Sequence, residues 1–178
     1  MINPTKNLSI RPYENVDMPI LKKWCYSGDY PEFFRDMLAL TEEQLKVYSY
    51  MKDGQGYIIW KDEEPIGFII LYQMALVPAN VKLSILIDKK YQGQKYCFEA
   101  MIEMGNYVFN RLRMKKLIVE IIENNERLRN ILIEGGFKEE CVLIDEAKLE
   151  DKWINVIRYV MFDEQFAEIK KLFGGQNG

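Results

Sequence analysis

The spacing of hydrophobic and polar residues changes period along the chain and predicts a mixture of strands and helices. Residues 8–11 alternate apolar and polar side chains, as a half-buried strand does. Asp17 then begins a helix that has Pro19 in its first turn and is expected to end at Gly28. Further along the first half we expect an irregular aromatic segment over 29–40, a helix over 41–51 that starts with a capping-box spacing, a turn over 53–56 and a strand over 57–60.

The second half alternates strand and helix patterns more regularly. A tight connection over 61–65 joins the strand at 57–60 to one at 66–72, which predicts a hairpin. Apolar residues at three- and four-residue steps predict a helix over 97–112 between strands at 81–88 and 117–122, and this order forms a right-handed crossover between parallel strands. The remaining expected elements are a helix capped by Asn125 and ended by Gly135-Gly136, strands at 137–144 and 153–161 joined by a polar loop, and a helix at 165–173.

This pattern predicts an α/β fold with a single mixed central β-sheet flanked by helices. The 178 residues suit one domain, which we place at residues 1–173 and which a glycine-rich tail follows at 174–178. Hydrophobic residues make up 48% of the chain and charged residues 29%, an ordinary globular balance. The formal net charge is −3. A uniformly basic nucleic-acid-binding surface is therefore not expected.

The composition also limits the chemistry. The chain has no histidine, which excludes Ser-His-Asp catalysis and histidine-ligated metal sites, so no metal is expected. Its three cysteines are far apart and odd in number, a usage typical of reduced thiols in a cytoplasmic protein. No segment approaches the ~20 apolar residues of a membrane span, and the first residues do not resemble a signal peptide.

The segment between the strand at 81–88 and the following helix is the candidate binding site. It reads Gln92-Gly93-Gln94-Lys95-Tyr96-Cys97. A strand end, a glycine and a helix N-terminus together place several free backbone N–H groups around one point, and the helix dipole adds partial positive charge there. The segment therefore suits the pyrophosphate of a nucleotide-like cofactor.

Over nearly its whole length the chain resembles the GNAT superfamily of N-acetyltransferases, in particular the branch that acetylates ribosomal-protein N-termini or spermidine. The resemblance rests on five segments: 8–12, 64–69, 84–94 with Glu99-Ala100, Asn125 with Gly136-Phe137, and 153–159. It implies that acetyl-CoA is bound by the main chain of Ile85 and Ile87, by residues 92–97 and by Asn125. It further implies an acceptor amine on a protein N-terminus, a polyamine or another small molecule, and allows for a homo-oligomer.

Four positions depart from the family pattern. Lys95 and Cys97 replace small residues of the phosphate loop, where a Cβ could obstruct the phosphates, although Lys95 could instead place its charge on them. Leu132 occupies the position of a tyrosine that protonates the leaving thiolate in many members. Lys82 lies near where some members have a glutamate base. The sequence therefore names no catalytic acid or base.

These departures leave a second interpretation open. A GNAT fold without activity would serve as a structural or interaction module in a larger assembly, such as a virus particle. In that case Lys95, Tyr96 and their neighbours would fill the space between the strands at 81–88 and 117–122. In an active enzyme the same space would receive acetyl-CoA.

Overall fold

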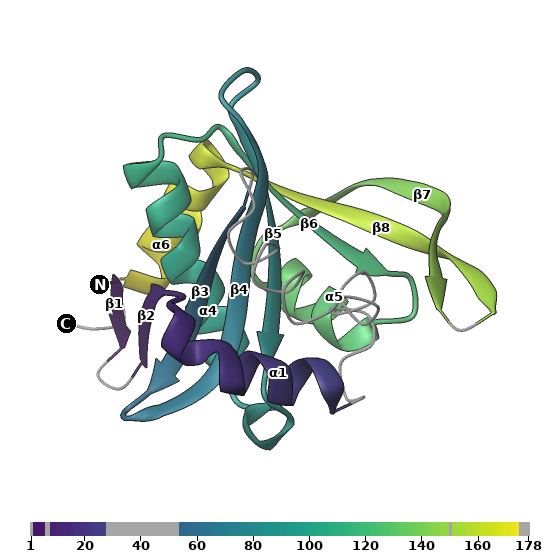
Figure 1. Cartoon of the computed structure of the whole chain (residues 1–178). Helices are drawn as coiled ribbons and strands as arrows, with labels where there is room; N and C mark the ends of the chain where they lie inside the picture. The colour runs from purple at the N-terminus through teal and green to yellow at the C-terminus, as the bar shows by residue number, and fades with distance from the viewer. Residues whose placement is uncertain (1, 6–7, 28–53, 150, 175–178) are drawn as a thin grey trace.

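One mixed sheet forms the centre of the molecule (Figure 1). The computed structural model describes residues 2–5, 8–27, 54–149 and 151–174. Within them the strand order is β1-β2-β3-β4-β5-β6-β8-β7, and only β5 and β6 pair in parallel. The strands are β1 (Ile2–Thr5), β2 (Leu8–Pro12), β3 (Gly54–Lys61), β4 (Glu64–Ala75), β5 (Asn80–Ile87), β6 (Lys116–Ile122), β7 (Lys138–Leu149) and β8 (Lys152–Phe162).

Helices cover both faces of this sheet, as predicted. On one face, α1 (Met18–Tyr26) packs Leu21 and Trp24 against β3 and β4. The other face is covered by α4 (Tyr96–Asn106), α5 (Glu126–Glu134) and α6 (Asp163–Gly174), which contribute buried side chains to one large core. Among the helices of the described residues, none is long and apolar enough to cross a membrane.

Two local features fix the elements around the candidate site. Ala100, Met101 and Met104 are buried at three- and four-residue steps, so α4 presents one apolar stripe to the sheet. The indole Nε1 of Trp24 donates a 2.7 Å hydrogen bond to Asp88. This bond joins α1 to the residue that directly follows β5, where the loop that leads to α4 begins.

Several boundaries differ from the sequence prediction. Gly54 and Gly56 belong to β3, not to a turn: Gly56 lacks a side chain where the ring of Phe68 lies, 2.9 Å from the position of a Cβ. The helix expected at 97–112 is α4 followed by a π-helical segment, Tyr107–Arg111. The expectations for 29–51 and for 175–178 lie outside the described residues.

The last hairpin is longer than its sequence suggested. The segment 145–152 was expected to be a loop because it is polar, yet β7 reaches Leu149 and β8 starts at Lys152. Backbone pairing across the hairpin continues through Ala147 and Ile154. Polar side chains can occupy these strands because most of this part of β7 is exposed. β1 was not predicted and pairs with β2 at the other edge of the sheet.

Candidate functional site

The parallel pair at the centre of the sheet separates along its length. β5 and β6 pair only from Asn80 to Lys82 and from Lys116 to Ile118, and beyond that point they diverge (Figure 1). The N–H of Asp88 bonds to a β4 carbonyl at 2.8 Å. Because backbone groups alternate along a strand, those of Ile85 and Ile87 point away from β4, towards the side that β6 has left. This free edge is where the resemblance places the pantetheine arm.

The loop after β5 leads directly to a helix end. Gly93 has a φ of +80°, a conformation that favours glycine, and α4 then starts at Tyr96. The first bond of the helix runs from the N–H of Glu99 to the carbonyl of Lys95, at 3.0 Å. The N–H groups of Tyr96 and Cys97 precede this bond and face the end of the helix, where an anion is favoured.

A side chain from the other side of the divergence completes this site. Nε2 of Gln92 donates to the carbonyl of Ile87 at 2.9 Å, and Nη1 of Arg127 donates to Oε1 of Gln92 at 2.7 Å. The other guanidinium nitrogen, Nη2, lies 4.0 Å from where a Cβ on Gly93 would stand. Arg127 belongs to the first turn of α5, so it connects α5 to the cofactor loop across the separation between β5 and β6.

The sequence analysis missed Arg127. In the sequence, Arg127 is distinguished only by its position two residues after Asn125. The sequence does not show which face of α5 turns towards the loop. Asn125 itself behaves as expected, since its side-chain oxygen accepts a hydrogen bond from the N–H of Leu128 at 3.2 Å and caps the helix. A contact between Asn125 and acetyl-CoA stays a prediction.

The two unusual loop residues are compatible with the loop conformation. Lys95 is the N-cap of α4 with φ −68° and ψ 4°, which any residue can adopt, and its side chain is exposed. Burial raises the pKa of Cys97 to about 12, against a smaller lowering by the charge of Arg127. The thiol is therefore protonated at neutral pH and is not a nucleophile. Gly93 is the loop position whose backbone conformation calls for glycine.

The position of the missing tyrosine lies in the core. Leu132 has no exposed surface and packs in the cluster that α4 and the sheet share. Leucine has no proton to transfer, so this chain has no acid at the position of the family's tyrosine.

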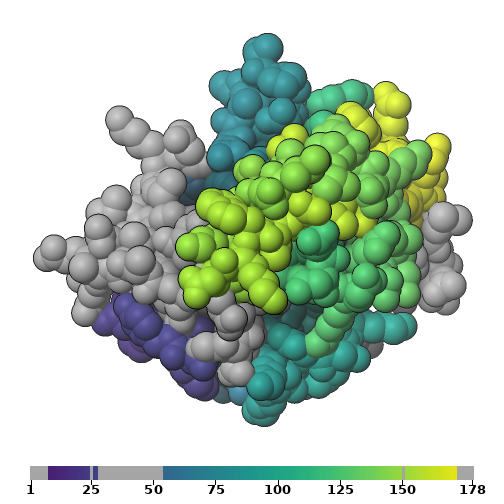
Figure 2. Space-filling view, turned by 90° about the vertical axis from the view of Figure 1, so that its right-hand side faces the viewer, coloured from purple at the N-terminus to yellow at the C-terminus, as the bar shows by residue number. Residues whose placement is uncertain are grey.

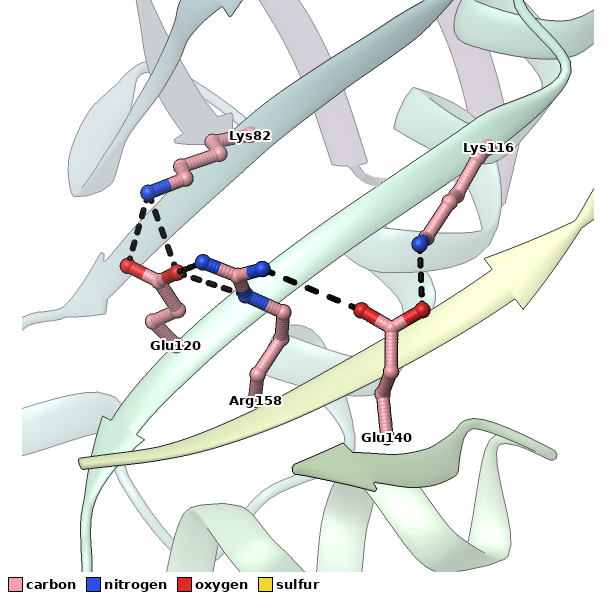
Figure 3. A network of polar contacts seen from close by, with 5 residues as sticks. All are labelled: Lys82, Lys116, Glu120, Glu140 and Arg158. Atoms are coloured by element: carbon pink, nitrogen blue, oxygen red, sulfur yellow. Dashed lines mark hydrogen bonds and ion pairs between the residues drawn. The ribbon is translucent and has the colours of Figure 1, made fainter. Parts of the chain in front are cut away.

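Charged side chains gather where β5 and β6 begin to separate (Figure 3). Lys82 Nζ lies 3.0 Å from the carboxylate of Glu120 on β6, and Arg158 on β8 contacts the same carboxylate through Nε at 2.9 Å and Nη2 at 2.7 Å. Glu140 on β7 forms an ion pair with Lys116 and lies 3.9 Å from Arg158. We call these five residues the apex cluster.

The sequence also matches known proteins. Residues 7–138 match the family model described as an acetyltransferase (GNAT) domain. The chain belongs to the GNAT family. It is 26% identical over 170 residues to spermidine N(1)-acetyltransferase of Escherichia coli K12, covering 90% of this chain and 88% of the relative. The fold matches a spermidine N-acetyltransferase from Vibrio cholerae, crystallised with CoA and spermine, with a TM-score of 0.84 at 15% identity over 92% of this chain and 99% of the other.

These matches confirm the predicted fold, family and class of activity. The chain is a GNAT N-acetyltransferase, which transfers an acetyl group from acetyl-CoA to an amine. The inactive-scaffold interpretation receives no support from them. The assignment of individual residues to acetyl-CoA and the domain boundaries stay predictions.

Proposed function

We propose that acetyl-CoA is bound between the diverging ends of β5 and β6. Its pyrophosphate would lie at the start of α4, among the N–H groups of residues 93–97 and the charges of Lys95 and Arg127. Its pantetheine arm would follow the backbone edge of Ile85 and Ile87, where it would share the Ile87 carbonyl with Gln92, and Asn125 would lie on the other side. The observation that carries the proposal is that β5 and β6 stop pairing after Lys82. The backbone groups that the arm would contact, at Ile85 and Ile87, follow directly.

The chemistry in this arrangement is a direct transfer. The lone pair of a neutral amine attacks the thioester carbonyl carbon, and an N–H near Ile85 donates to the oxyanion that forms. The carbon–sulfur bond then breaks. Water or a carboxylate takes the proton that the amine nitrogen loses, and the CoA thiolate leaves and is protonated by solvent. The products are an amide and free CoA.

Amines related to spermidine are the first acceptors to assay. The Escherichia coli relative is named for spermidine, and the Vibrio cholerae structure contains spermine. Protein N-termini and other small amines are further candidates from the sequence. The part of the chain expected to face the acceptor includes residues 29–40, which lie outside the described residues.

The exposed apolar side chains of the β7–β8 hairpin support a homo-oligomer. Another Vibrio cholerae spermidine N-acetyltransferase structure, with a TM-score of 0.76 at 18% identity, is dodecameric. In this chain the hairpin crosses the face seen in Figure 2 and exposes Val142, Ile144 and Trp153, which are 46%, 78% and 61% accessible. Light scattering should give a mass above that of one chain, reduced by Trp153→Glu. A monomeric wild type at micromolar concentration would refute this part of the proposal.

Calorimetric titration with acetyl-CoA tests the cofactor site. We expect micromolar binding by the wild type and none by Gly93→Glu, which places a carboxylate at the proposed pyrophosphate position. Asn110→Glu adds the same charge to an exposed position in the π-helical segment after α4 and should bind like the wild type. Absence of wild-type binding at millimolar acetyl-CoA, or equal loss in both variants, would refute the proposed site.

A further inference from the structure

The apex cluster lies where the proposed pantetheine arm ends. An extended arm that follows the free edge of β5 from Ile87 to Ile85 reaches the point where β6 resumes pairing, at Lys82. The thioester at the end of the arm is therefore close to Lys82 and to Glu120 on the facing strand. This step rests on the proposed function.

The cluster belongs to one face of the sheet. Leu86 packs with α1, and side chains alternate along a strand, so Lys82 points to the same face as Leu86. On β6 and β8 the neighbours of Glu120 and Arg158 belong to the core on the opposite face. An acceptor that reaches the thioester from the side of α1 therefore meets the apex cluster.

The charges of this cluster do not favour a polycation. Three cations, Lys82, Lys116 and Arg158, stand against two carboxylates, which leaves one net positive charge. Each carboxylate already has two cationic neighbours: Glu120 has Lys82 and Arg158, and Glu140 has Lys116 and Arg158. A second ammonium group on the acceptor would have to displace one of these cations from its carboxylate. The net positive charge of the cluster would also repel it.

The same cluster retains donors for an anion. Nζ of Lys82 contacts both oxygens of Glu120 but has three N–H groups in all. Nη1 of Arg158 lies 3.9 Å from Glu140, beyond hydrogen-bond distance, so it can donate elsewhere. Glu120 is 14% exposed and Lys82 18%, so solvent screens their charges less than it would on an open surface.

We propose that the acceptor is an amine that also carries a carboxylate, and that Lys82 and Arg158 receive this carboxylate. The thioester is placed between Ile85 and Lys82, at the level of Ser84. Residues along a strand are about 3.3 Å apart, so the thioester would lie about 7 Å along β5 from Lys82. This spacing suits a linear ω-amino acid, whose methylene chain separates the amine from the carboxylate, and not an α-amino acid, in which one carbon separates them. Such an acceptor differs from the polyamines named for the relatives.

Competing acceptors test this inference. The full-length protein is assayed with acetyl-CoA and three amines: spermidine, cadaverine, and 6-aminohexanoate, which has the methylene chain of cadaverine but ends in a carboxylate. We expect kcat/KM to be at least about tenfold higher for 6-aminohexanoate than for cadaverine, the size expected from one charge–charge interaction near a protein surface. Lys82→Glu should reverse this preference, and the milder Lys82→Gln should reduce it. Lys115→Gln, which removes an exposed lysine outside the cluster, should leave it unchanged.

The outcomes separate the two proposals. Preference of the wild type for spermidine or cadaverine overturns the inference but leaves the proposed function intact. An unchanged ratio in both Lys82 variants also overturns it, as does turnover of none of the three amines by a protein that binds acetyl-CoA. Failure to bind acetyl-CoA in the calorimetric titration removes the proposed function, and with it the inference.

Discussion

Replacement of Gly93 by alanine measures how much the positive φ angle of one residue between β5 and α4 costs in free energy of unfolding. Gly93 has a φ of +80°, and a Cβ built there meets one neighbouring atom, Nη2 of Arg127, at the van der Waals distance of 4.0 Å. The change therefore creates no clash. A side chain at positive φ costs about 1–2 kcal/mol, and the lower entropy of the unfolded alanine chain returns about 0.5 kcal/mol. We expect the free energy of unfolding to fall by about 1 kcal/mol.

Urea denaturation measures this loss. With a slope of about 2 kcal/mol per molar urea, the midpoint should fall by about 0.5 M while the slope stays the same. Gly93→Asn should cost less, because asparagine tolerates positive φ better than alanine does. Gly67→Ala is the contrasting case, since its Cβ would stand 2.4 Å from the carbonyl oxygen of Leu86, and it should cost more. Unchanged or increased stability in Gly93→Ala would refute the argument from backbone conformation.

Three further substitutions or treatments test other parts of the structure. Arg127→Gln should weaken acetyl-CoA binding about tenfold or more in calorimetry, because a charge-assisted bond to phosphate is lost; unchanged affinity would exclude Arg127 from the site. Gly105→Ala should lower the thermal midpoint, since its Cβ would stand 2.5 Å from the ring of Phe166, and an unchanged midpoint would show that the ring moves without cost. Cys97 should resist alkylation in the native protein at neutral pH, because burial raises the pKa of its thiol to about 12. Rapid native alkylation of Cys97, followed by mass spectrometry of its peptide, would contradict that protonation state.

Local patterns were sufficient for most of the fold. The helix α4 and the capping by Asn125 depend on residues close in sequence, and both formed as predicted. The patterns gave wrong predictions where one residue type is common in two kinds of structure. Gly56 indicated a turn, but in the structure its missing side chain makes room for Phe68 on the neighbouring strand. The polar segment 145–152 indicated a loop, but backbone pairing with a neighbour extends the strands through most of it.

The sequence by itself determined the loop between β5 and α4, because a strand end, a glycine and a helix start are contiguous in the chain. It also determined the order of the described strands and helices from β2 onwards. Only the tertiary structure decided what surrounds them. It brought Arg127 to Gln92 across the separation of β5 and β6, and it placed Lys82 beside Glu120 and Arg158 from two other strands. These contacts join residues 35 or 38 positions apart. Their partners depend on strand order and on the direction of each side chain, which no local pattern contains.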